Sequence, residues 1–195
     1  MPQEATVENL SGPREACGVF AAYAPGQQVS SLIYFGLFAL QHRGQESAGI
    51  ATSDGETVTV FKDMGLVAQV FDQATLAGLD GHLGIGHTRY STTGSTSWDN
   101  AQPAHRQVGN TSIALGHNGN LTNTGELADQ LGIAGATTDS DLMAESLARL
   151  IDDERSDARG LLAALSVAAS SWKGAFSLVL MDQGRWAEAE PLLLA

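Results

Sequence analysis

The order of the apolar segments constrains the fold of this chain more than any other feature of its sequence. Short apolar or alternating runs at 18–24, 57–62, 83–88 and 111–117 are typical of strands. Amphipathic helical patterns come next, and a last apolar run at 175–181 is again typical of a buried strand. The predicted order is strands, then helices, then a strand, and strands and helices rarely alternate. This order favours separate layers over a doubly wound parallel sheet. The sequence therefore predicts an α+β fold.

Hydrophobic periodicity predicts four helices on this framework. The first, at 29–40, has residues at helical spacing that would form one buried face: Val29, Leu32, Ile33, Gly36, Leu37 and Leu40. A short helix is expected at 123–132, where Asn and Glu have capping-box spacing and Gly132 can end the helix. Two longer helices are expected around 143–151 and 161–172. Each would bury one face against a sheet.

Length and charge limit the domain organisation and the partners. A chain of 195 residues predicts one domain, which we place at 17–182. Residues 1–16 are polar and without period, and we interpret them as a leader, with 183–195 as a divergent tail. The net charge of −12 repels phosphate backbones, so no binding to nucleic acid is expected.

Two further classes are excluded by composition. The longest apolar stretch, at 32–40, is about half of what a membrane span needs, and the N-terminus lacks the pattern of a signal peptide. We therefore expect a cytoplasmic protein that does not bind membranes. The single cysteine, Cys17, excludes an internal disulfide and any site in this chain that needs several cysteines, such as an iron–sulfur cluster.

Residues suited to chemistry gather in four loops at the ends of predicted strands. These loops are Cys17-Gly18, QHRGQESAG at 41–49, GHTRYSTTG at 86–94 and HNGN at 117–120. Arg, His, Asn and Gly between apolar strands are typical of binding and catalytic sites. Common metal and nucleotide motifs are absent from the sequence, including HExxH and a phosphate loop, and we predict no metal site.

Cys17 admits two interpretations. A lone cysteine is often a small buried hydrophobe. As a nucleophile it needs a base, and one of the five histidines could serve. Removal of residues 1–16 would offer another base, because the α-amine of Cys17 titrates near the pKa of a free thiol.

Asn118 and Gly119 also allow a structural and a catalytic interpretation. Asn-Gly is a strong signal for a two-residue hairpin, and the dipeptide alone favours that turn. Alternatively, the Asn118 amide and the Gly119 N–H could both donate to one oxyanion.

Arg89 and Asp139 are candidate substrate-binding residues. Arg89 could form a surface salt bridge, or it could hold a substrate carboxylate with its planar fork. Asp139 precedes a predicted helix and could be its N-cap, a role for which Asp141 competes. If Asp141 caps the helix, Asp139 is available for a substrate ammonium group.

Together the four loops resemble the glutaminase domain of the amidophosphoribosyltransferase family, in the same order, from Cys17 to about Asp182. The segments that carry this resemblance are CGVF after a leader, LQHRGQESAGI, GHTRYSTTG, AQPAH, LGHNGNLTN and TTDSD. The family catalyses the first step of de novo purine (IMP) biosynthesis. Glutamine yields glutamate and ammonia, and the ammonia converts phosphoribosyl pyrophosphate to 5-phosphoribosylamine.

The resemblance implies a role for each candidate residue. Cys17, exposed by autocatalytic removal of a propeptide, looks like the nucleophile, and its α-amine the proton shuttle. Asn118 and Gly119 match the oxyanion donors. Arg89 matches the residue that holds the glutamine α-carboxylate, and Asp139 the residue that holds its α-ammonium group.

The resemblance also implies a fold and partners. The fold is the N-terminal-nucleophile hydrolase sandwich of four layers, αββα, which we expect to be incomplete at its C-terminal end. Glutamine is the expected ligand, and the family's members are homo-oligomers. No cofactor is expected here, since Mg²⁺ and phosphoribosyl pyrophosphate belong with a phosphoribosyltransferase domain that the sequence lacks.

Two other functions stay open at this point. The chain could be the glutaminase half of another class II amidotransferase, such as one similar to glucosamine-6-phosphate synthase, although RYSTTG and HNGNLTN favour the purine type. It could also be an inactive truncated remnant, because the resemblance stops after Asp182.

Overall fold

The computed structural model describes residues 17–90, 97–152 and 160–183. The predicted leader, nearly all of the predicted tail and part of the GHTRYSTTG loop lie outside these residues. None of the helices in the described ranges has both the length and the apolarity needed to cross a bilayer.

Two antiparallel sheets form the centre of the molecule. The first has the strand order β1-β4-β2-β3 and consists of β1 (Gly18–Tyr23), β2 (Ser47–Ser53), β3 (Val58–Met64) and β4 (Leu83–Arg89). The second has the order β5-β6-β7 and consists of β5 (Ala104–Val108), β6 (Thr111–Leu121) and β7 (Gly174–Asp182). Every neighbouring pair of strands is antiparallel.

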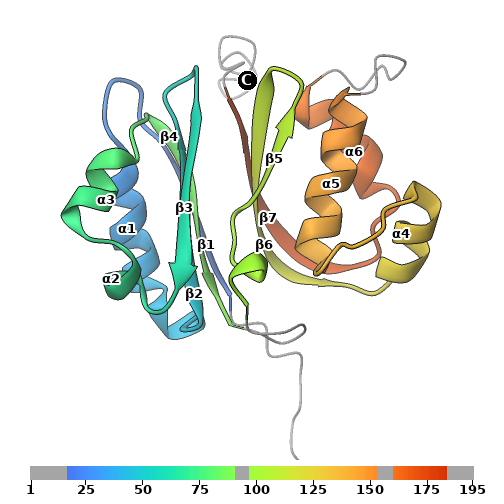
Figure 1. Cartoon of the computed structure of the whole chain (residues 1–195), viewed down its shortest axis with the longest axis horizontal. Helices are drawn as coiled ribbons and strands as arrows, with labels where there is room; N and C mark the ends of the chain where they lie inside the picture. Colours follow the sequence, from blue (N-terminus) through green and yellow to red (C-terminus); the bar gives the residue numbers. More distant parts are fainter. Residues whose placement is uncertain (1–16, 91–96, 153–159, 184–195) are drawn as a thin grey trace, which may run out of the picture.

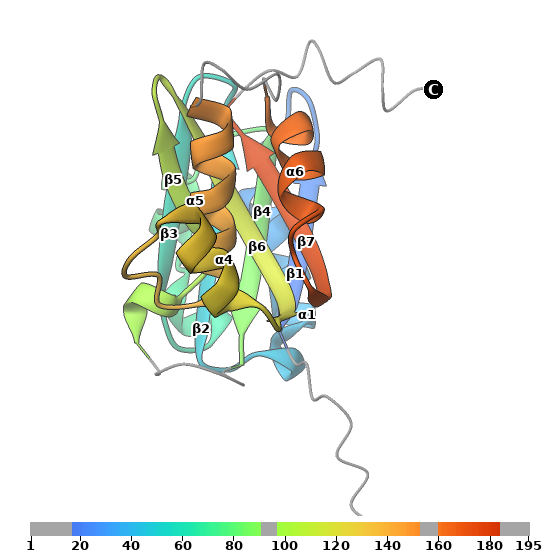
Figure 2. The ribbon, with the colours of Figure 1, turned by 90° about the vertical axis from the view of Figure 1, so that its right-hand side faces the viewer.

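Helices cover the outer face of each sheet (Figure 1). On the first sheet lie α1 (Ser30–Ala39), α2 (Val67–Val70) and α3 (Gln73–Gly78), with the short 3₁₀ helix η1 (Gln41–Arg43) after α1. On the second lie α4 (Thr124–Leu131), α5 (Asp139–Asp152) and α6 (Leu161–Ala169), as Figure 2 shows from that side. A second 3₁₀ helix, η2 (Trp98–Asn100), precedes β5. The α+β prediction and the αββα layering are confirmed.

Glycines in β4 explain how closely α1 approaches its sheet. A Cβ at Gly84 would lie 2.5 Å from the Ile33 side chain, and one at Gly86 would lie 2.6 Å from it. Because successive strand residues face opposite sides, these two glycines face α1 while Ile85 faces the other sheet. The glycine-rich run at 83–88 thus lets Ile33 and Leu37 of α1 become fully buried.

Separate apolar clusters fill the layers. Between the sheets the core is built from small and medium side chains: Ala51, Leu83, Ile85, Ala114 and Met181. Between the second sheet and its helices the core is larger, and Ile113, Leu115, Met143 and Leu147 are fully buried there. The alternation along β6 therefore directs odd-numbered residues to the helices and even-numbered residues to the first sheet.

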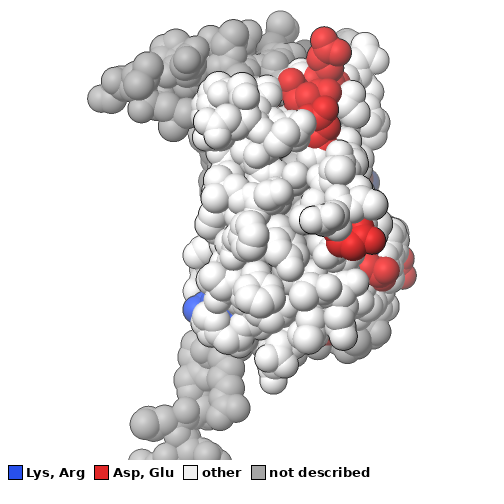
Figure 3. Space-filling view, turned by 90° about the vertical axis from the view of Figure 1, so that its left-hand side faces the viewer, with Lys and Arg blue, Asp and Glu red and all other residues white. Residues whose placement is uncertain are grey.

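The outer face of α1 is apolar as well. Its sequence from Ser30 to Ala39 contains no charged residue. Leu32, Phe35 and Phe38 are each more than half exposed. Figure 3 shows the side of the molecule that α1–α3 cover, with few charged side chains.

Two strands and two helices lie where the sequence pattern predicts none. β2 is completely buried, but its sequence SAGIATS consists mainly of small residues and lacks an alternating pattern. β5, α2 and α3 are short. Short elements and small side chains give weak periodicity, so only the tertiary packing identifies them.

Candidate active site

The five predicted site residues come from four segments at one end of the sandwich. The start of β1, the end of β4, the last part of β6 and the start of α5 lie at the lower end in Figure 1. Gly18 pairs with Thr88 in the β1–β4 ladder, so Cys17 lies beside Arg89, the next residue of β4. The antiparallel strand order therefore gathers segments that are far apart in sequence.

Cys17 directly precedes β1 and is partly buried. Its thiol donates a long hydrogen bond to the Tyr90 carbonyl oxygen, at 3.7 Å, and Arg43 Nε donates to the Cys17 carbonyl oxygen at 3.1 Å. Burial raises the pKa of the Cys17 thiol, and the positive charge of Arg89 partly opposes this. A thiol in this state is protonated at neutral pH, so it needs a base to react as a thiolate.

Two acidic groups also act on that thiol. The charges of Glu46 and Asp139 both raise the Cys17 pKa, which shows that these carboxylates lie within electrostatic range of the sulfur. Cys17, Arg89 and Asp139, three residues that sequence reasoning singled out, are therefore brought together by the fold.

Arg89 is buried rather than exposed, so a surface salt bridge is the wrong interpretation. Its Nη1 donates to Glu46 Oε1 at 2.6 Å, and the two side chains are 6% and 12% exposed. The backbones of the same two residues are also in contact: Glu46 N donates to the Arg89 carbonyl oxygen at 3.0 Å. Sequence reasoning flagged the 41–49 loop but did not identify Glu46 as the partner that orients the guanidinium group.

Asn118 and Gly119 lie within β6 and do not form a hairpin. They pair with Ser177 and Phe176 of β7, in a ladder that continues to Leu121. The prediction of a turn there is wrong, because the strand is longer than its apolar part. By the alternation along β6, the Asn118 side chain faces the first sheet, on the side to which Arg89 and His87 of β4 also point.

Gly119 cannot be replaced by a larger residue without a shift of the backbone. Its φ is 147°, in a region that favours glycine. A Cβ there would lie 2.3 Å from the Ala175 carbonyl oxygen and 2.5 Å from Phe176 Cα. The strand therefore needs glycine directly after Asn118.

Asp139 is the first residue of α5, but it is not the cap of that helix. The cap is Thr138, whose hydroxyl accepts from Asp141 N at 3.1 Å and whose carbonyl oxygen accepts from Leu142 N at 3.1 Å. Asp139 Oδ2 instead accepts from Leu121 N at 3.1 Å. Both N-cap interpretations are thus wrong, and the carboxylate of Asp139 is held against the end of β6.

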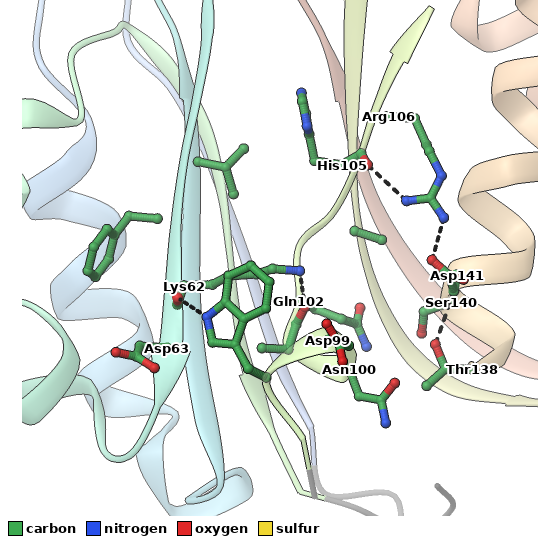
Figure 4. A pocket seen from close by; sticks show the side chains of 15 residues that line it. Lys62, Asp63, Asp99, Asn100, Gln102, His105, Arg106, Thr138, Ser140 and Asp141 are labelled. Carbon is green, nitrogen blue, oxygen red and sulfur yellow. Dashed lines mark hydrogen bonds and ion pairs between the residues drawn. The ribbon is translucent and has the colours of Figure 1, made fainter. Parts of the chain in front are cut away.

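Asp141 takes part in an ion-pair cluster instead of capping α5. Arg106 Nη2 donates to Asp141 Oδ1, and Arg106 Nε donates to Glu145 Oε2 at 3.0 Å. Arg106 and Asp141 border a cavity of about 530 Å³ between β3 and β5, shown in Figure 4. A second cavity, of about 500 Å³, is bordered by Asp139 and the start of α4. Neither of these two cavities is lined by Cys17, Arg89 or Asn118.

No group of three or more His, Cys, Asp or Glu side chains within 17–90, 97–152 and 160–183 could hold a metal ion.

A buried polar network connects the two sheets next to these residues. His87 of β4 donates from Nε2 to the His117 carbonyl oxygen at 3.0 Å. The His117 ring, on the other face of β6, lies with Nδ1 2.9 Å from Ser140 Oγ and 3.7 Å from Asp139 Oδ1. Burial lowers the pKa of His87 to about 3, so this ring stays neutral in the folded protein.

The His87 pKa predicts acid sensitivity of the fold. Between pH 6.5 and about 3 the unfolded chain binds a proton at this position that the folded chain does not, so stability falls as pH falls through that window. The slope from this group is about 1.4 kcal/mol per pH unit. His87→Gln keeps a donor for His117 but has no titrating group. Urea unfolding at pH 7 and pH 5 should show a smaller loss in the variant. Equal losses in both proteins would contradict this prediction.

The four-layer αββα sandwich is the fold of N-terminal-nucleophile hydrolases, with Cys17 directly before its first strand and the Arg89–Glu46 ion pair at the same end of the sheet. Residues 26–190 match the family model of class-II glutamine amidotransferases. The chain belongs to the class-II glutamine amidotransferase family.

Relatives and solved structures agree with this assignment. An amidophosphoribosyltransferase of Mycobacterium leprae is 52% identical over 185 residues, which cover 90% of this chain and 32% of that protein. One of Synechococcus elongatus is 51% identical over 178 residues, or 89% of this chain and 35% of that protein. The chain spans about a third of the length of these relatives.

The fold is similar to that of a solved relative. The glutamine phosphoribosylpyrophosphate amidotransferase from B. subtilis, solved with ADP and GMP, is 36% identical with a TM-score of 0.71. That match covers 84% of this chain and 34% of the other. The resemblance inferred from the sequence motifs is confirmed, and the chain corresponds to the class-II glutamine amidotransferase domain of such enzymes.

Proposed function

We propose that this chain hydrolyses glutamine to glutamate and ammonia through a thioester at Cys17. The observation that carries the proposal is the convergence of Cys17, Arg89 and Asp139, with the Asn118-Gly119 pair in β6 of the facing sheet. A thiol, a cationic fork and a carboxylate are the groups needed to attack an amide while holding an α-amino acid.

The chemistry begins with the proton of the thiol. The raised pKa of Cys17 means that attack needs a base. We assign that role to the α-amine of Cys17 itself, which removal of residues 1–16 would free. The thiolate attacks the side-chain carbonyl carbon of glutamine, and the protonated amine donates to the departing nitrogen.

The remaining residues stabilise charge. The oxygen of the tetrahedral intermediate accepts from the Asn118 amide and the Gly119 N–H. Ammonia leaves as the thioester forms, and water then hydrolyses the thioester to glutamate and restores the thiol. Arg89 holds the α-carboxylate and Asp139 the α-ammonium group.

The proposal extends to the longer protein. Amidophosphoribosyltransferase relatives at about half identity favour use of the ammonia to convert phosphoribosyl pyrophosphate to 5-phosphoribosylamine, in purine synthesis. The hydrolysis itself needs no metal, since the nucleophile is a thiol and the base an amine. Mg²⁺ would act with phosphoribosyl pyrophosphate on another domain. A thiol nucleophile must stay reduced, which supports a cytoplasmic location.

Oligomerisation belongs to the same proposal. Leu32, Phe35 and Phe38 on α1 have exposed apolar side chains, which support association of this face with another protein surface. Sedimentation of the purified chain measures whether copies of it associate.

Glutamate and ammonia release by the purified chain tests the proposed hydrolysis. Activity that persists in the presence of a chelator would agree with a metal-free mechanism. Absence of glutamate release by folded protein with residues 1–16 removed would contradict the proposal.

Arg89→Lys and Asp139→Asn should weaken glutamine binding more than they slow the chemistry. A charged hydrogen bond is worth about 1.5–3 kcal/mol, so KM should rise roughly 10- to 100-fold with a smaller change in kcat. Arg149→Lys and Asp129→Asn, both outside the site, are the matched controls. If Asp139→Asn mainly lowers the unfolding temperature and leaves KM unchanged, its role is structural.

A further inference from the structure

The segment that leads from η2 into β5, residues 98–103, is fastened to the edge of the first sheet. Lys62 Nζ of β3 donates to the carbonyl oxygens of Ala101 and Pro103, and Trp98 Nε1 donates to the Lys62 carbonyl oxygen at 3.1 Å. Figure 4 shows Lys62 and Gln102 side by side in this region. This segment is therefore anchored independently of the second sheet.

Close packing with β2 anchors the same segment. A Cβ at Gly49 would lie 2.1 Å from the Gln102 carbonyl oxygen, so the backbone at Gln102 touches the strand directly. A side chain at position 49 would displace it. Residue 102 thus has a fixed backbone position between the two sheets.

The Gln102 side chain takes the place of a strand beside β6. The β5–β6 ladder ends with Ala104 opposite Leu115. If the ladder continued by two more places in the same register, Gln102 would lie opposite His117. The ladder does not continue, because Pro103 has no N–H to donate. There the Gln102 Oε1 accepts from His117 N at 2.7 Å, and Gln102 Nε2 donates to the His117 carbonyl oxygen at 3.3 Å.

These contacts hold the backbone directly before the oxyanion donors. His117 precedes Asn118, and past Leu115 the strand β5 gives β6 no ladder partner on that side. Gln102 is 7% exposed, so its two hydrogen bonds are formed away from solvent. Donors to an oxyanion act through their fixed position, and an error of about 1 Å can cost a factor of 10² in rate.

We propose that Gln102 is a positioning residue for glutamine hydrolysis, which sets the Asn118 amide and the Gly119 N–H through the backbone of His117. The inference rests on the proposed glutaminase activity. Arg89 is held separately by Glu46, and Asp139 is held by the capped start of α5 and by Leu121 N, which lies beyond Gly119 on β6. Loss of the Gln102 amide should therefore affect the transition state more than the binding of glutamine.

The test compares Gln102→Ala and Gln102→Glu with Gln107→Ala in the full chain. Gln107 is an exposed residue of β5 that bonds to Ser112, and it serves as the control. Gln102→Ala should lower kcat about 10- to 100-fold with KM for glutamine within about twofold. Gln102→Glu keeps an acceptor for the His117 N–H and should recover part of kcat.

A second readout separates positioning from a general loss of structure. Inactivation by a diazoketone analogue of glutamine should slow in Gln102→Ala, because its ketone oxygen uses the oxyanion donors. Competitive inhibition by glutamate should be unchanged, since glutamate is held by its α-groups. If Gln102→Ala does not fold, the same two measurements on Gln102→Glu decide the matter.

Unchanged kcat in either folded Gln102 variant would overturn the inference, and so would a rise in KM alone. A wild-type chain that releases no glutamate would instead overturn the proposed hydrolysis, and the inference with it. The wild-type assay therefore distinguishes the two failures.

Discussion

Cys17→Ala should abolish glutamine hydrolysis, with glutamate release falling to background. No other cysteine is present in the chain to replace the nucleophile. Among the described residues the thiol forms one hydrogen bond, the long one to the Tyr90 carbonyl oxygen at 3.7 Å, so its removal should hardly change the unfolding temperature. Measurement of glutamate release and thermal unfolding on the same preparation separates lost chemistry from lost structure.

Intact mass gives a further result from the same variant. The wild-type chain should lose residues 1–16, and Cys17→Ala should keep them if the cleavage is autocatalytic. Full-length mass in active wild-type protein would contradict the role of the Cys17 α-amine. Glutamate release by Cys17→Ala above background would exclude the thioester mechanism.

Asn118→Ala should lower kcat by about 10²–10³, the usual cost of one oxyanion donor, with little change in KM. The side chain donates only when the oxygen carries charge, so its loss affects the transition state and not the binding of glutamine. Steady-state kinetics with glutamine provides both parameters.

Asn123→Ala is the matched control for that variant. Asn123 bonds to the Ser171 carbonyl oxygen and to Lys173 N, both at 3.0 Å, and these contacts join α4 to the start of β7. Its loss should lower stability and leave kcat nearly unchanged. If Asn118→Ala raises KM at constant kcat, Asn118 is a binding residue and its assignment is wrong.

The sequence singled out residues that the fold gathers at one end of the sandwich, but it predicted the wrong local structure at Asn118-Gly119. Cys17, Arg89 and Asp139 could be singled out because their neighbours form recognisable motifs in a fixed order. The hairpin expected at Asn118-Gly119 was wrong because a local turn signal ignores the pairing of β6 with β7. Tertiary hydrogen bonds outweigh local propensity there.

The sequence could not predict which residues contact each other across distant segments. Glu46 and Arg89 are 43 residues apart, and only the antiparallel alignment of β2 with β4 brings them together. Gln102 and His117 meet because the β5–β6 ladder stops at Ala104 and Leu115, two places before them. Neither contact leaves a periodic signal along the chain.

The sequence by itself determined the class of fold and the order of its main strands and helices, and it singled out candidate residues for attack on an amide. Periodicity and residue chemistry are local properties, and they can be recognised along the chain. Only the tertiary structure decided which charge orients Arg89, which residue caps α5 and which side chain holds the backbone of His117. Those outcomes depend on strand register and helix packing, which are set by contacts between distant segments.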